Sequence, residues 1–345
     1  MRGMPPTTSR LWRAGAALAA LALAGLLVLG GALAAKKKPR KMPRGPYPAL
    51  GCPLFPRSHA AANAPSAADQ TAWRQDVSQA PLAENSAAII ARINAAGGDF
   101  LHPDFGSPRA YGFPYAVTGK RQKRVPVRFT AYGEESDRGT YRVPLRALVE
   151  GGQRSDGDRH VIAVDRRRCR LQELYRGFAR KRPKPPHWDA DSGVIWNLRS
   201  AALRPDGWTS ADAAGLPIFP GLVRLDEARR GAIHHAIRVT FSQTRDAWVH
   251  PASHCAGDTS DPDAPAMGTR LRLAAGYDLS GFGGAARVIA VALKRYGLIV
   301  ADNGSNWFIS GTSDRRWNDE DLDQLKRIPG SAFEVVRSAA PVHAC

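Results

Sequence analysis

Glu150, Asp158 and His160 are the residues whose types and spacing best suit acid–base chemistry. Asp158 and His160 lie two positions apart at the start of an expected strand, so their side chains would project the same way. A carboxylate beside an imidazole orients a group that titrates near neutral pH, and Glu150 could supply a proton from the preceding loop. The structural alternative has Asp158 capping turn amides and His160 half-buried at a sheet edge.

A second group of residues suits carbohydrate. The carboxylates that could face a glycan are those of Glu150, Asp158, Asp191, Asp278 and Asp302. A glycosidase needs two such groups about 5–10 Å apart. We predict Trp196, Trp307 and Asp302 as ligand-binding residues, because an indole offers a broad apolar face for a sugar ring. The alternatives are two core tryptophans and a turn aspartate.

The segment HPASHC, residues 250–255, places two histidines four residues apart. On a helix this spacing suits a metal ion, but Pro251 disfavours a helix and no downstream carboxylate completes the set. A thiol nucleophile at Cys255 conflicts with its expected disulfide. The sequence also lacks a phosphate-binding loop, a GxGxxG and a GxSxG motif. We therefore expect no metal and no cofactor.

The four cysteines, Cys52, Cys169, Cys255 and Cys345, indicate two disulfides in an oxidising compartment, with three possible connectivities. We favour Cys52–Cys169, because Cys52 opens the folded part and Cys169 begins an expected strand. Cys255–Cys345 then follows by elimination and would fasten the C-terminus.

Residues 1–34 predict a signal peptide: arginines precede a long apolar stretch, and Ala32-Leu33-Ala34 suits cleavage before Ala35. The stretch is also long enough to remain as an uncleaved membrane anchor. Lysines 36–38 follow immediately and would resist translocation. Both alternatives place the chain outside the cytoplasm: it is exported, as a secreted or periplasmic and cell-envelope protein, or held by the anchor.

Residues 35–50 predict a basic, proline-rich linker that could touch an anionic membrane surface. Residues 1–44 hold nine basic and no acidic residues, so the net charge of +18 falls to +9 for the remainder. A basic domain suits acidic or neutral polysaccharide as a partner. Specific nucleic-acid binding is not indicated, because basic and aromatic residues are not interleaved. The sequence does not indicate an oligomeric state.

Short alternating stretches separated by glycine and proline dominate residues 51–340. They predict a single domain that is mainly β, a large jelly-roll-like β-sandwich with a few packed helices. Expected strands include 160–165 and 170–175, joined by a basic turn, and 234–241. Expected helices include 84–98 and 286–297. Asn303-Gly304 predicts a tight hairpin.

Six phrases resemble a family of exported bacterial proteins with no established activity: CPLFP (52–56), LHPDFG (101–106), GDRHVIAVD (157–165), RPDGWTSADAAGLPIFPGLVR (204–224), LKRYGLIVADNGSNWFISG (293–311) and RIPGSAFEVV (327–336). The resemblance spans nearly all of residues 52–336. It implies one shared domain and export, and it implies no reaction.

Two functions from different classes follow. The first is an exported β-sandwich that binds and, if an enzyme, cleaves extracellular or cell-wall polysaccharide as a hydrolase or lyase. Its catalytic groups would be Glu150, Asp158 and His160. The second is a noncatalytic envelope or surface protein with a binding or structural role. Convergence of the three side chains within hydrogen-bond reach would favour the enzyme, whereas scattered side chains, or side chains that only cap backbone, would favour the second function.

Overall fold

The computed structural model describes residues 52, 71–106, 111–200, 202–342 and 345, and these are mainly strands in three mixed sheets with few helices. All of them belong to one compact unit. The coarse fold prediction is therefore confirmed. The predicted signal peptide or anchor (1–34) and the linker (35–50) lie outside the described residues, and no helix within the described ranges is long and apolar enough to cross a bilayer.

The first sheet has the strand order β1-β4-β5-β8, with β1 parallel to β4 and the other pairs antiparallel. Its strands are β1 (Tyr115–Thr118), β4 (Val161–Asp165), β5 (Arg170–Tyr175) and β8 (Ser192–Asn197). The predicted β4–β5 hairpin is confirmed. Asp165 makes its turn, since one carboxylate oxygen accepts hydrogen bonds from the amides of Arg167 and Arg168.

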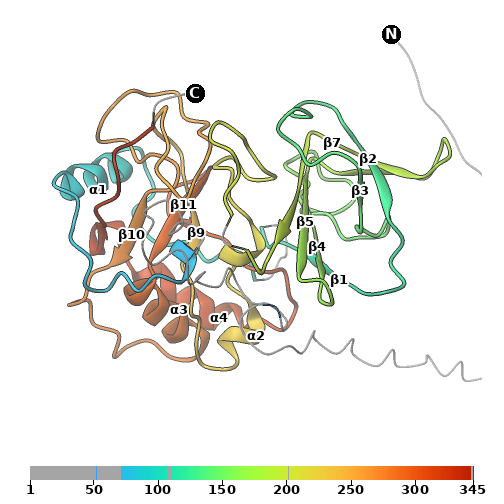
Figure 1. Cartoon of the computed structure of the whole chain (residues 1–345). Helices are drawn as coiled ribbons and strands as arrows, with labels where there is room; N and C mark the ends of the chain where they lie inside the picture. The colour runs from blue at the N-terminus through green and yellow to red at the C-terminus, as the bar shows by residue number, and fades with distance from the viewer. Residues whose placement is uncertain (1–51, 53–70, 107–110, 201, 343–344) are drawn as a thin grey trace, which may run out of the picture. The chain divides into compact units, whose positions relative to one another are not determined.

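The second sheet, in the order β3-β2-β7-β6, packs on one face of the first. Its strands are β2 (Val125–Phe129), β3 (Thr140–Tyr141), β6 (Phe178–Arg180) and β7 (His187–Ala190). Val161 and Ala163 of β4 face this sheet and pack in the same cluster as Trp188. Ile162 and Val164 point the other way, into the larger core. The first sheet is thus a middle layer, which is why β4 is buried along its whole length (Figure 1).

The third sheet has the order β12-β9-β11-β10-β13. Its strands are β9 (Ile237–Phe241), β10 (Arg270–Leu273), β11 (Leu298–Asn303), β12 (Phe308–Ile309) and β13 (Phe333–Val335). The helices are α1 (Ser86–Ala95), α2 (Leu225–Ala228), α3 (Gly284–Arg295) and α4 (Asp319–Asp323). Short 3-10 turns lie at Thr71–Arg74, Phe219–Gly221, Gln324–Arg327 and Gly330–Ala332. Helices 84–98 and 286–297 were predicted from periodicity, and α1 and α3 confirm them.

The Asn303-Gly304 turn differs from the predicted hairpin. Strands β11 and β12 both pair with β9, one on each side, so β9 separates them. The Gly304 amide donates to the Phe241 carbonyl at 3.0 Å, and the Thr240 hydroxyl donates to the Ser305 carbonyl at 2.8 Å. The turn therefore crosses the end of β9. The Asp302 carboxylate consequently lies 3.7 Å from the guanidinium of Arg238 on the neighbouring strand β9.

Both predicted disulfides are confirmed: Cys52–Cys169 and Cys255–Cys345. The first joins Cys52 to the β4–β5 turn, and the second joins Cys255 to the C-terminal residue. Paired cysteines indicate an oxidising environment, extracellular or periplasmic.

We predict that replacing Cys52 and Cys169 together with alanine lowers the free energy of unfolding by about 3 kcal/mol, because the bond closes a loop of 117 residues in the unfolded chain. Urea denaturation of the variant and the parent protein measures the difference. Coincident denaturation midpoints would contradict the prediction.

Candidate functional site

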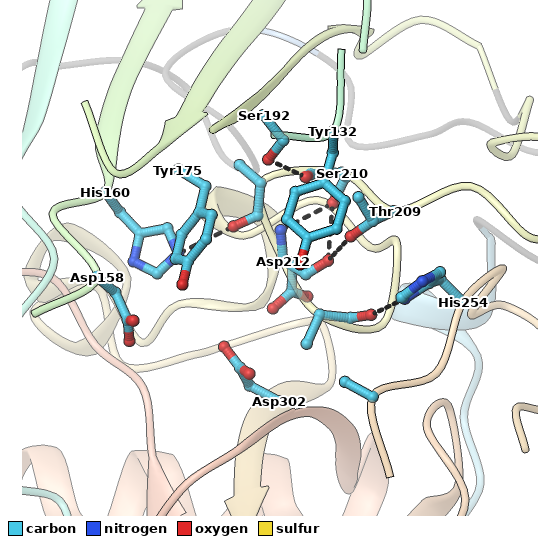
Figure 2. A pocket seen from close by; sticks show the side chains of 13 residues that line it. Tyr132, Asp158, His160, Tyr175, Ser192, Thr209, Ser210, Asp212, His254 and Asp302 are labelled. Atoms are coloured by element: carbon cyan, nitrogen blue, oxygen red, sulfur yellow. Dashed lines mark hydrogen bonds between the residues drawn. The ribbon is translucent and has the colours of Figure 1, made fainter. Parts of the chain in front are cut away.

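A pocket of about 210 Å³ lies where the first sheet meets the third. Asp158 and Tyr175 enter it from the β4–β5 side, and Asp212 and Asp302 from the other (Figure 2). A second hollow of about 380 Å³ adjoins it and shares Asp158, His160 and Asp302. These three residues therefore stand at the junction of the two hollows.

His160 lies against the wall of the pocket, almost fully buried, with both ring nitrogens engaged. Nδ1 is 2.5 Å from a carboxylate oxygen of Glu150, and Nε2 donates to the Ala211 carbonyl at 2.9 Å. Burial would lower the pKa of His160, but the charge and hydrogen bond of Glu150 outweigh it and raise the pKa to about 9. Burial would likewise raise the pKa of Glu150, and His160 holds it below its usual value. The pair is therefore ionised, and His160 has no free nitrogen to act as a base.

Asp158 does not join the Glu150–His160 pair. The residue between Asp158 and His160, Arg159, has a φ of 53°, and its guanidinium donates to the carbonyls of Ser155 and Gly177. This left-handed residue interrupts the strand alternation that the sequence prediction assumed. The exposed Asp158 carboxylate points into the pocket beside Tyr175 (Figure 2). The described part of the chain places no hydrogen-bond donor on it.

Asp302 is the carboxylate opposite Asp158. It is held at the end of β11, where one oxygen accepts the Asn303 amide and the other is 3.7 Å from the Arg238 guanidinium. Its side chain keeps 24% of its surface exposed. Burial, with the nearby charge of Asp212, raises the pKa of Asp302 to about 7. At neutral pH this carboxyl is protonated in a large fraction of molecules.

Asp212 and Arg238 form a buried ion pair beneath Asp302. Arg238 also donates to the Ser310 hydroxyl at 2.8 Å. Burial raises the pKa of Asp212 to about 6, although Arg238 opposes the shift. The second carboxylate oxygen of Asp212 is buried without a hydrogen-bond partner in the described structure, and the residue lines the pocket. An unsatisfied acceptor of this kind suits a ligand hydroxyl or a water molecule.

The predicted tryptophan platforms lie elsewhere. Trp196 is 5% exposed and donates its ring N–H to the buried Glu173, and Trp307 is fully buried and donates to Asn94. Neither ring offers a face to a ligand, because both belong to the hydrophobic core. Aromatic rings at the pocket are instead those of Tyr132 and Tyr175 (Figure 2).

The histidines of HPASHC point to different partners. His250 bonds to Asp206 at 2.9 Å, and His254 bonds to the Ala213 carbonyl at 2.8 Å. Cys255 is in its disulfide. Over the described ranges, no group of three or more histidine, cysteine or acidic side chains is placed to hold a metal ion.

No protein-family model, no curated protein and no solved structure matches this chain. The function therefore has to be argued from the pocket itself. Two carboxylates face one another there, one of them partly protonated at neutral pH, above a buried polar network. Such a pair can donate a proton to one atom of a ligand while stabilising or removing charge at another.

The sequence analysis did not identify four residues that line the pocket or form the buried ion pair beside it: Asp212, Arg238, Tyr132 and Tyr175. Asp212 and Arg238 each carried one signal, a charged residue within an otherwise apolar stretch.

The other two sequence-predicted carboxylates lie outside both hollows: Asp191 pairs with Arg176 at 3.2 Å, and Asp278 bonds to Ser280.

Proposed function

We propose that this protein is exported and that it binds and hydrolyses an extracellular or cell-wall polysaccharide, with Asp302 as proton donor and Asp158 as the second carboxylate. The observation that carries the proposal is the position of both side chains at the junction of two hollows, where Asp302 has a pKa of about 7 and Asp158 is exposed. Glycoside hydrolysis requires one carboxyl group that gives a proton and a second that acts as base or nucleophile.

The reaction balances with these two groups and one water molecule. Asp302 gives its proton to the bridging oxygen as the bond from that oxygen to the anomeric carbon breaks. Asp158 either takes a proton from the attacking water or first bonds to the anomeric carbon and is then released by water. Elimination with His160 as the base is not supported, because both of its ring nitrogens are occupied.

The compartment that the disulfides indicate fits this proposal. The two disulfides support export, and the signal peptide of residues 1–34 stays a prediction. We also propose that the first two sheets form a sandwich, because their facing side chains share one cluster. The jelly-roll connection stays a prediction.

The noncatalytic alternative draws on the failure of Glu150, Asp158 and His160 to converge. Glu150 and His160 bond to each other and to backbone, as in a structural pair, and Asp158 does not join them. The test is a panel of neutral, amino-bearing and acidic glycans incubated with the purified full chain, scored for new reducing ends and for binding. New reducing ends with at least one glycan support hydrolysis. Binding without any cleavage favours the alternative.

We predict that the cleavage rate falls as pH rises through about 7. Asp302 acts in its protonated form, and its proton is lost through that range because burial raises its pKa to about 7. A pH–rate profile from pH 4 to 9 measures the descending limb. A rate that keeps rising above pH 8 would contradict the assignment of Asp302 as the acid.

A further inference from the structure

The two hollows at the carboxylates continue into a third. The hollow of about 380 Å³ shares Asp104 and Tyr111 with another of about 220 Å³ that extends toward α4. The three hollows are therefore contiguous through shared residues, and Asp158 and Asp302 lie at one junction rather than at a closed end. Three hollows joined in this way suit a chain of several sugar units better than a single one.

An exposed aromatic ring stands between the second and third hollows. Tyr111 keeps 64% of its surface exposed, and its ring meets the edge of Phe308 with 6.4 Å between ring centroids. His102 stacks on Phe308 at 4.4 Å and is 3.3 Å from the carboxylate of Asp104. Phe308 is held by its stacking on His102, while the Tyr111 ring beside it remains accessible. An accessible ring fixed at a groove is the usual platform for the apolar face of a sugar.

The charges along the groove are mostly negative. Asp158 and the partly ionised Asp302 face the first two hollows, and Asp104 and Asp323 line the third. Among the described residues that line the hollows, each cation has an acidic partner, and the partner of His160 is Glu150. Lys326 is paired with Asp104 and Asp323, and Arg238 is 1% exposed and paired with Asp212. Such a groove repels anionic sugars and accepts neutral or amino-bearing ones.

We propose that Tyr111 and Phe308 form a sugar-binding subsite for a neutral or amino-bearing glycan chain that runs along the groove past the two carboxylates. The inference rests on the glycan-binding half of the proposed function and adds a substrate class. Although the chain after residue 44 carries a net charge of +9, this site then selects against acidic polysaccharide. Because the groove continues beyond the carboxylates, cleavage falls within a chain.

The test measures binding by calorimetry in full-chain Asp302→Asn protein, which keeps the probes intact. The probes are an N-acetylglucosamine hexamer, its de-N-acetylated form and a galacturonate hexamer. Added to this background, Tyr111→Ala should weaken binding of the first two about tenfold, and Tyr111→Phe should keep it within about twofold, because the ring and not the hydroxyl makes the platform. Phe100→Ala is the matched control, since Phe100 is 46% exposed and lines none of the three hollows.

Three results would overturn the subsite: no binding of either non-acidic hexamer, equal binding by Tyr111→Ala and its background, or tighter binding of the galacturonate. Cleavage by the protein with native Asp302 is scored separately. Tyr111-dependent binding without cleavage would support the subsite and overturn the hydrolytic proposal, so the two failures are distinguishable.

Discussion

Replacing Asp302 with asparagine is expected to lower the rate of glycan cleavage about a thousandfold while leaving glycan affinity within about threefold. General acid catalysis contributes roughly a hundredfold to ten-thousandfold to a rate, and an amide cannot supply the proton. The substitution keeps the size of the side chain, and its oxygen can still accept the Asn303 amide. The fold should therefore persist, because the Arg238–Asp212 pair below remains intact.

The matched control is Asp278→Asn, which removes an exposed carboxylate that bonds to Ser280 and lies outside both hollows at the carboxylate pair. Its cleavage rate should equal that of the parent protein. Thermal denaturation of both variants shows whether any loss of rate reflects unfolding. A fully active, folded Asp302→Asn protein would remove Asp302 from the mechanism.

Features set by neighbouring residues were predictable from the sequence. The β4–β5 hairpin needs only two alternating stretches and a charged turn, and Asp165 supplies the turn from its own side chain. Helix α3 shows its apolar stripe and ends before Gly297, whose φ of 70° suits a glycine after a helix. The disulfide between Cys52 and Cys169 joins residues 117 apart, and its prediction used only their places in the sequence, one opening the folded part and the other directly before β5.

Features set by distant residues were not predictable in the same way. Asn303-Gly304 is a strong local signal for a hairpin, yet β9 arrives from about 60 residues earlier and separates β11 from β12. The local preference of Asn303-Gly304 for a turn does not indicate which strand lies between β11 and β12. Burial on both faces of a strand also depends on residues distant in the sequence. The sequence therefore suggested Trp196 as a sugar-stacking residue, whereas in the structure it packs in the core.

The candidate site shows the same division. Asp158 and Asp302 were both named from the sequence, but their relation to each other depends on two sheets meeting across the pocket. The φ of Arg159 separates Asp158 from His160, and no spacing rule reveals it. Asp212 comes from an irregular segment between sheets, where neither strand nor helix periodicity marks a side chain that points into a hollow.

Breaking the Glu150–His160 pair is expected to cost stability rather than to remove a general base. Glu150→Ala leaves His160, 3% exposed, without its counterion, and we expect the free energy of unfolding at pH 7 to fall by about 4 kcal/mol. Urea denaturation measures the loss. The matched control is the double variant Glu150→Leu with His160→Phe, which removes both partners and should recover most of it, because no buried charge remains.

The pH dependence of the same pair gives a second readout. The pKa of His160 is raised from its ordinary 6.5 to about 9 in the folded protein, so the folded state binds the proton more tightly than the unfolded state. The stabilisation is therefore complete below pH 6.5 and is lost as pH rises through about 9. The stability of the parent should fall across that interval more steeply than that of the double variant. Parallel profiles, or a Glu150→Ala protein as stable as the parent, would mean that His160 is neutral in the fold and open to a role as a base.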